Sequence, residues 1–345
     1  MRPYLGKIIT ICGFFAGLAL TAWFISRVGI ALLLGGFNAV GWGVLLVITV
    51  RAAIVVTNGV AWSRLLTQLS KVPLWAFICL RWFRESADCL LPLAGISGGV
   101  IGARALTFWN VRGALAAASV VADLLLQTLA QVLFALIGVI MLWPQLEGAE
   151  AGSAIGVAAV VAAIILAGFY ALQRHGGAHV IDRTFVVISA RIASGRQYVA
   201  PGFHNATEKI WHGRRGYVFA DLTLHLVAWS IGTLEVWITL HLLGFSISVQ
   251  QALVLESLGT SISSAAFFIP GSWGIQEGGY ILIGQVLGLP VEASLLLSLV
   301  KRVPDLALGA PGLAAWYIVE AKRLWLRSNG KAGNFAPHWP HTGLE

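Results

Sequence analysis

Six long apolar runs dominate the chain, and each is long enough to cross a lipid bilayer. They cover residues 8–28, 41–66, 112–142, 153–173, 216–244 and 291–320. A helix rises about 1.5 Å per residue, so about 20 apolar residues cross the roughly 30 Å hydrocarbon core of a membrane. A helix also satisfies its own backbone polar groups where there is no water. The runs therefore predict an all-α integral membrane protein with six transmembrane helices.

The composition agrees with this class and argues against others. Hydrophobic residues make up 58% of the chain and charged residues 11%, whereas a soluble domain carries about 25% charged residues. The net charge of +8 therefore indicates basic loops beside anionic lipid heads and no nucleic-acid partner. The three cysteines lie in apolar runs and lack the spacing of a disulfide framework or a zinc site. We expect no metal and no cofactor.

Two further apolar regions, 74–108 and 249–288, are each broken near the middle. The first break reads LLPLAGISGG (90–99) and the second FIPGSWGIQEGG (268–279). Proline removes a backbone donor and glycine permits tight turns, so each region predicts two short helices. The residues expected to form the breaks are Pro92, Gly98, Gly99, Pro270, Gly271, Gly274, Gly278 and Gly279.

Loop charges predict the orientation of these segments. Residues 174–215 carry seven Lys or Arg and two acids, which predicts a cytoplasmic loop, whereas 143–152 carries two acids and no Lys or Arg. Basic residues near both termini place the N- and C-termini in the cytoplasm. These assignments agree when each broken region enters and leaves on one side, as a re-entrant hairpin. Two kinked spanning helices are the alternative.

The order helix, helix, hairpin, helix occurs twice. It occupies residues 1–146 and again 149–326, and three crossings per unit invert the second unit relative to the first. Residues 327–345 are polar and predict a disordered cytoplasmic tail. Broken segments at matching positions of two inverted halves indicate a transporter-like central site. The fold expected is six transmembrane helices plus two opposed re-entrant helical hairpins in an inverted repeat.

Ionisable residues interrupt the first hairpin on one helix face. At about 100° per residue, they fall within an arc of about 100°, and they are Arg81, Arg84, Glu85 and Asp88. Arg81 with Glu85, and Arg84 with Asp88, are i,i+4 pairs that can neutralise each other. Two interpretations remain open, a polar path for a lipid head group and a structural ion-pair cluster.

The last apolar run carries Lys301, Arg302 and Asp305. Their expected partners are in the second hairpin, which offers Gln276, Glu277 and Glu256. We expect Lys301 or Arg302 to pair with Glu277. A cation and an anion side by side suit a zwitterionic or phosphate head group, and equally suit a lock that holds the hairpin in place.

The run 216–244 places a histidine and two acids on one stripe, which comprises Asp221, His225, Gly232, Glu235 and Thr239. Such a stripe inside a membrane suits a proton relay, and a hydrogen-bonded packing histidine is the alternative. Asp123, alone in the third run, is expected to meet one of the arginines. Arg51, alone in the second, is expected either to extend toward the membrane surface or to pair with an acid.

The chain lacks a Walker loop, HExxH and CxxC, and Ser272 has no histidine near it in sequence. We therefore expect a protein that is not an enzyme.

The motif PGSWGIQEGGYILIG, followed by LPVEASLLLSLVKRVPDLALGAPGLAAW, resembles the C-terminal signature of a flippase-like membrane family. That family includes the transmembrane region of lysylphosphatidylglycerol synthases, and the chain looks most like its branch of hopanoid-biosynthesis-associated bacterial proteins. In the first hairpin RESADCLLPLAGISGG is similar to the family pattern, and the resemblance covers about residues 5–325. The chain departs from it at VVADLLLQ, where many members carry an arginine in an acidic motif. We also expect no soluble transferase domain.

The resemblance implies lipid handling in the bacterial inner membrane and not lysyl transfer. The expected function is translocation of a membrane lipid, namely a hopanoid, another isoprenoid-derived lipid or a phospholipid. Lipid-biosynthesis enzymes are the expected protein partners. A lipid-modifying transferase and a non-catalytic scaffold for hopanoid biosynthesis remain as alternatives.

Overall fold

The computed structural model describes residues 23, 26, 30–91, 97–143, 202–211, 215–265 and 272–328. These residues form helices, turns and short connections without any strand, which confirms the all-α prediction over this part of the chain. The predicted span 153–173 and nearly all of 8–28 lie outside the described residues. So do the break residues Pro92, Pro270 and Gly271, and the tail beyond residue 328.

Three helical segments in the described ranges are long and apolar enough to cross a membrane. They are Leu34–Leu66, Gly113–Leu142 and Arg215–Leu242, and they coincide with the predicted runs 41–66, 112–142 and 216–244. The first comprises the end of α2 (Ile30–Val40), a short 3-10 turn and α3 (Val44–Leu66). The other two are α6 (Gly113–Leu142) and α10 (Arg215–Leu242). The predicted run 291–320 lies within α13 (Val291–Ser328), which is longer but more polar and contains Pro304 and Pro311.

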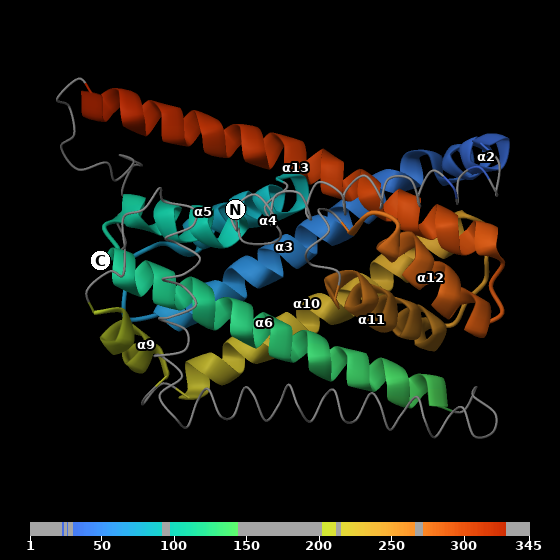
Figure 1. The fold of residues 1–345 in the computed structure, drawn as a ribbon, viewed down its shortest axis with the longest axis horizontal. Helices are drawn as coiled ribbons and strands as arrows, with labels where there is room; N and C mark the ends of the chain where they lie inside the picture. Colours follow the sequence, from blue (N-terminus) through green and yellow to red (C-terminus); the bar gives the residue numbers. More distant parts are fainter. Residues whose placement is uncertain are drawn as a thin grey trace, which may run out of the picture.

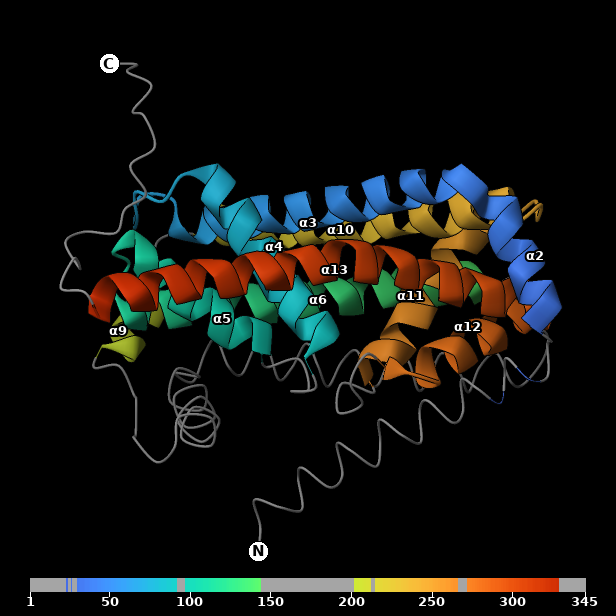
Figure 2. The same ribbon diagram turned by 90° about the horizontal axis from the view of Figure 1, so that it is seen from above.

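Four long helices, α3, α6, α10 and α13, run along the bundle, and two pairs of short helices lie at its opposite ends (Figure 1). One pair is α4 (Leu74–Leu90) with α5 (Ser97–Leu106), and the other is α11 (Val249–Ala265) with α12 (Ile275–Val286). Within each pair the two short helices pack against each other. The turned view in Figure 2 again places α5 and α12 at opposite ends. The order long, short, short, long thus occurs from α3 to α6 and from α10 to α13.

Side-chain caps set where the second helix of each pair begins. An Oδ1 atom of Asp88 accepts the N–H of Gly98 at 2.8 Å, and a Cβ on Gly98 would overlap the Asp88 carboxylate and the Arg84 carbonyl. At the other end Gly274 has φ +77°, a conformation that favours glycine, and Glu277 accepts its N–H at 2.7 Å. Of the predicted break residues, Gly98, Gly99, Gly278 and Gly279 therefore lie in the first turns of α5 and α12 and not in the loops before them.

The two larger apolar cores lie toward the two ends of the bundle. One packs α3, α4, α5, α6 and the end of α13, and includes Trp62, Phe77 and Trp316. The other packs α10, α11, α12 and the start of α13, and includes Leu240, Leu255 and Leu297. In lipid, such helices associate by close packing and not by the exclusion of water.

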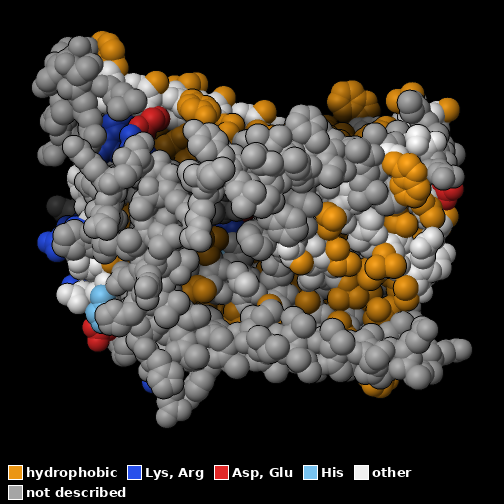
Figure 3. All heavy atoms as spheres, viewed as in Figure 1, with side chains coloured by type: hydrophobic (Ala, Val, Ile, Leu, Met, Phe, Trp, Pro, Cys, Tyr) orange, Lys and Arg blue, Asp and Glu red, His pale blue; other side chains and the backbone are white. Residues whose placement is uncertain are grey.

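The two ends of the bundle differ in charge. Basic residues gather where α3, α5 and α13 end and where α6 and α10 begin, and they include Arg64, Lys71, Arg104, Arg112, Lys209, Arg215 and Lys322. The opposite end contains the connections 241–250 and 286–292, which carry no Lys or Arg. On the face seen in Figure 3, charged side chains show mainly at the left edge and hydrophobic ones cover much of the right half.

Candidate functional site

A cavity of about 500 Å³ lies in the middle of the bundle, where the two pairs of short helices converge. The ends of α4 and α11 and the start of α12 contribute to its wall, together with α3, α6, α10 and α13. Seven predicted site residues line it, namely Arg81, Arg84, Glu85, Asp88, Gln276, Lys301 and Asp305. The other three, Asp123, Glu277 and Arg302, do not line it. Asp123 pairs with Arg81 and Arg84 of the cavity wall, and Glu277 and Arg302 pair with each other.

Asp123 of α6 is the centre of the first cluster of charges. Its Oδ2 atom lies 2.9 Å from Nη1 of Arg81 and 2.7 Å from Nη1 of Arg84, both on α4. These distances confirm the predicted pairing of Asp123 with an arginine. All three side chains are buried. Arg81 also donates to Glu85 at 2.7 Å, as the i,i+4 spacing predicted.

The predicted pair Arg84–Asp88 is wrong. Arg84 pairs with Asp123 and places its guanidinium over the ring of Trp62, 4.6 Å from the centroid. The Asp88 carboxylate is engaged at the start of α5, where it accepts from Gly98 and from the hydroxyl of Ser97 at 3.3 Å. A cap on the following helix therefore replaces the ion pair on the same helix.

The stripe on α10 joins this cluster. Nε2 of His225 lies 3.2 Å from Asp123 and 3.4 Å from Asp221, and its Nδ1 lies 3.0 Å from the Asn58 side chain. Asn58 in turn donates to Glu85 at 3.1 Å. Polar side-chain atoms of Asp123, Asp221 and His225 all lie within 4.8 Å of one another, but the guanidinium groups of Arg81 and Arg84 already pair with Asp123, which disfavours a metal cation at this cluster.

A second cluster surrounds Lys301 of α13. Its ammonium lies 2.8 Å from Glu256 of α11 and 3.6 Å from Glu235 of α10. The hydroxyl of Tyr280 on α12 also donates to Glu256, at 2.9 Å. Arg51 of α3 donates to Glu235 at 3.0 Å and lies 3.6 Å from Asp305, so Arg51 pairs with acids instead of extending toward the membrane surface.

Arg302 makes the contact predicted for the second hairpin. Its guanidinium pairs with Glu277 at 2.8 Å and lies 3.9 Å from the centroid of the Trp273 ring. Gln276 donates to Ser298 of α13 at 3.3 Å. These contacts attach the start of α12 to α13, which is the locking role considered for this pair.

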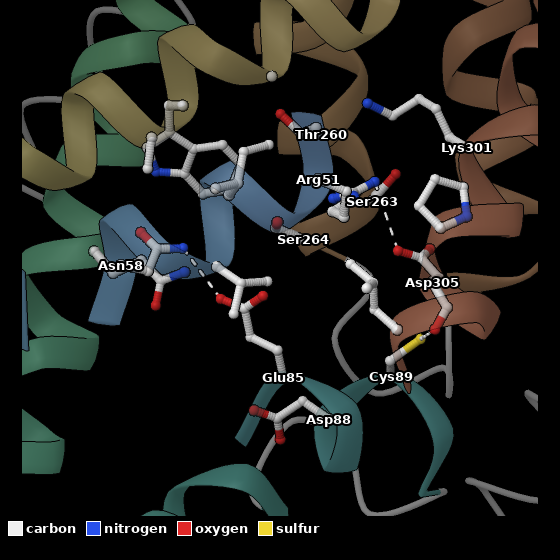
Figure 4. Close-up of a pocket in the computed structure, with 18 of the residues that line it drawn as sticks. Arg51, Asn58, Glu85, Asp88, Cys89, Thr260, Ser263, Ser264, Lys301 and Asp305 are labelled. Carbon is white, nitrogen blue, oxygen red and sulfur yellow. Dashed lines mark hydrogen bonds and ion pairs between the residues drawn. The ribbon is translucent and has the colours of Figure 1, made fainter. Parts of the chain in front are cut away.

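Figure 4 shows the cavity wall between the clusters. Asn58 and Glu85 face each other on one side, Arg51 faces Asp305 on another, and Thr260, Ser263 and Ser264 come from α11. Hydroxyl groups that can donate or accept therefore lie beside charged groups in one space. Such a wall can bind a polar head group that carries both negative and positive charge.

Sequence analysis did not identify Asn58 or Gln127 as site residues. Gln127 of α6 accepts from Nη2 of Arg81 at 3.0 Å, and both residues line the cavity. The available signal was the presence of amide side chains in two apolar helices, Asn58 in α3 and Gln127 and Gln131 in α6, where a polar group needs an internal partner.

Comparison with known families gives one result. A model described as the lysylphosphatidylglycerol synthase TM region matches residues 9–311, which include the whole cavity wall and both clusters. No curated protein and no solved structure matches the chain.

Proposed function

Because the chain belongs to the lysylphosphatidylglycerol synthase TM region family, we propose that it moves a membrane lipid between leaflets, with the central cavity as the head-group site. Family membership makes it a membrane protein with a lipid-related function. One observation carries the finer proposal. Helices α4, α11 and α12 from the two pairs of short helices, together with α3 and α13, bring ionisable or amide side chains to one cavity inside the bundle.

The physical task is to lower the cost of taking a polar head group through hydrocarbon. Transfer of one unpaired polar group out of water costs several kcal/mol, and a charged group costs more. The cavity offers groups of both charges that already have partners, so a head group can exchange one partner for another. At about 500 Å³ it suits a head group, while the lipid tails remain in the bilayer.

We propose six spans and two re-entrant hairpins that enter from opposite faces in an inverted repeat of 1–146 and 149–326. The lengths of the short helices support this. At about 1.5 Å per residue, α4 and α5 extend about 26 and 15 Å, and α12 extends about 18 Å, all less than the roughly 30 Å hydrocarbon core. The basic end of the bundle supports a cytoplasmic location for both termini in a bacterial inner membrane.

The lipid we propose is a hopanoid, another isoprenoid-derived lipid or a phospholipid, and lipid-biosynthesis enzymes are the protein partners we propose. We propose a transporter and not a transferase, because the charged groups at the cavity pair across helices in clusters of both signs. Such pairing suits the binding of a charged head group.

A vesicle assay tests the proposal. Purified protein is reconstituted into phosphatidylethanolamine and phosphatidylglycerol vesicles that contain a trace of NBD-labelled phosphatidylglycerol or NBD-labelled hopanoid, and dithionite quenches the outer leaflet. We expect the wild type to make the inner-leaflet probe accessible. Ser263→Trp, which fills the cavity, should abolish this, while Ser230→Trp on the exposed face of α10 should not.

Two results would contradict the proposal. One is that neither probe moves faster than in protein-free vesicles. The other is a lipid species that is missing from a deletion strain by mass spectrometry, with unchanged leaflet distribution of the rest, which would indicate a transferase.

A further inference from the structure

Hydrogen-bond partners determine which nitrogen of His225 carries a proton. Glu85 accepts from Nε of Arg81 at 2.7 Å, and the same oxygen accepts from the Asn58 amide at 3.1 Å. The Asn58 amide nitrogen is therefore directed at Glu85, and its carbonyl oxygen is directed at Nδ1 of His225 at 3.0 Å. An oxygen that only accepts requires N–H on Nδ1.

The second nitrogen then faces two acids. Nε2 of His225 lies 3.2 Å from an oxygen of Asp123 and 3.4 Å from an oxygen of Asp221. With the proton of a neutral ring on Nδ1, Nε2 would be a bare acceptor facing two acceptors. One further proton at Nε2 or on a carboxyl group makes these contacts favourable. The geometry therefore requires one bound proton in the cluster of Asp123, Asp221 and His225.

Asp221 provides an independent observation. Its side chain is fully buried, and neither of its oxygens has a hydrogen-bond partner among the described residues. Arg81 and Arg84 both pair with Asp123 and not with Asp221. A buried carboxylate that accepts no hydrogen bond is costly, and a proton, either on Asp221 itself or on the His225 nitrogen 3.4 Å away, lowers that cost.

The polar groups that face the cluster come from three neighbouring helices. The charged groups are Arg81, Arg84 and Glu85 on α4, while neutral amides come from Asn58 on α3 and from Gln127 on α6, which binds Arg81 beside Asp123. The guanidinium groups of Arg81 and Arg84 and the one bound proton carry three positive charges. They balance the carboxylates of Asp123, Asp221 and Glu85, so these groups together are neutral when the cavity holds no anion. The two guanidinium groups repel a metal cation, which favours a proton as the ligand.

We propose that Asp123, Asp221 and His225 form a proton-binding site that takes up one more proton when an anionic head group enters the cavity. Arg81 links the two events, because it pairs with Asp123 and also lines the cavity. A head-group anion at Arg81 adds one negative charge, and a second proton on the cluster restores neutrality. The coupling step rests on the proposed function, whereas the proton site itself does not.

Infrared spectroscopy of the purified full chain in detergent tests the proton site without any transport. The wild type should show a band of a protonated carboxyl or an imidazolium that changes with pH. The band should be lost in Asp221→Asn and in His225→Gln and retained in Asp305→Asn, a matched change outside the cluster. A wild type without such a band, or variants with wild-type spectra, would overturn the proton site.

Vesicles with a pH difference across the membrane test the coupling. With one proton per monoanionic NBD-phosphatidylglycerol, a difference of one pH unit should change the equilibrium leaflet ratio about tenfold, and a membrane potential alone should have no effect. His225→Gln should lose the pH response. Wild-type movement of the probe that ignores the pH difference would overturn the coupling and leave the proposed function intact. If nothing moves the probe, the proposed function fails, and the infrared result decides the proton site alone.

Discussion

Replacing Lys301 with methionine tests whether the second cluster holds its acids by charge pairing. The ammonium lies 2.8 Å from Glu256 and 3.6 Å from Glu235, and both carboxylates are buried. At an effective dielectric constant of about 20, Coulomb's law gives attractions of about 6 and about 5 kcal/mol. The cost of removing the ions from water offsets much of this, several kcal/mol per ion.

The single variant Lys301→Met leaves Glu256 with Tyr280 and Glu235 with Arg51, each missing one cation. Loss of one partner of a buried pair lowers the free energy of unfolding by about 3–5 kcal/mol. An unfolding entropy of about 2.1 cal/mol/K per residue gives about 0.7 kcal/mol/K for 345 residues. The midpoint of thermal unfolding should therefore fall by about 4–7 °C.

The double variant Lys301→Met, Glu256→Gln separates pairing from packing. It removes both charges of the shorter pair and keeps an oxygen that accepts from Tyr280, so it should cost less than Lys301→Met alone. Thermal unfolding in detergent, followed by tryptophan fluorescence, measures both. Arg104→Met is the surface control, because Arg104 pairs with Glu320 and is half exposed, and it should cost less than about 1 kcal/mol. A double variant as unstable as the single one would refute the reasoning.

Three further outcomes are expected. Gly59→Ala places a Cβ 2.7 Å from Cα of Ile78 and should destabilise the α3–α4 contact by about 1–3 kcal/mol in thermal unfolding, whereas Gly35→Ala, with open space around it, should not. Glu277→Ala should be less stable than Glu277→Gln by about 1 kcal/mol in the same assay, because only Gln keeps an acceptor for the Gly274 N–H, and equal stability would exclude the cap. Cysteine can be introduced in place of one residue at a time in a chain without its native cysteines. Cysteines at positions 71 and 110 should react with an impermeant reagent from one face of the membrane, and cysteines at positions 248 and 290 from the other face. If the two cysteines of either pair react from opposite faces, the re-entrant hairpins are ruled out.

Helix geometry predicted one of the two expected pairs within α4, because partners on other helices engage Arg84 and Asp88 instead. Arg81 and Glu85 are one turn apart, and they pair. The starts of α4 at Leu74 and α11 at Val249 also followed from sequence, as the first residues of the predicted broken regions, whereas α5 and α12 begin at Ser97 and Ile275, inside the predicted breaks. Proline and glycine are strong local signals of a break, and they act without any tertiary context.

Contacts between helices were predictable only in part. The pair Arg302–Glu277 was expected because neighbouring segments carry the two charges. The pairs of Lys301 with Glu256 and of Arg51 with Glu235 depend on the rotation and depth of several helices, which no single apolar run encodes. Asp88 shows the same limit, because its actual partner lies in the next helix.

The two prolines of α13 have a mechanical consequence. A proline has no backbone N–H to donate to the carbonyl four residues earlier, so the backbone hydrogen-bond ladder of α13 is interrupted at Pro304 and Pro311. Between them, the carbonyl of Leu308 accepts from the indole of Trp82 on α4 at 2.8 Å. The stretch from Pro304 to Gly309 also lines the cavity. Helix α13 connects both cores, and it is thus most easily bent beside the central cavity. Bending there can alter the width of the cavity without disturbing either core.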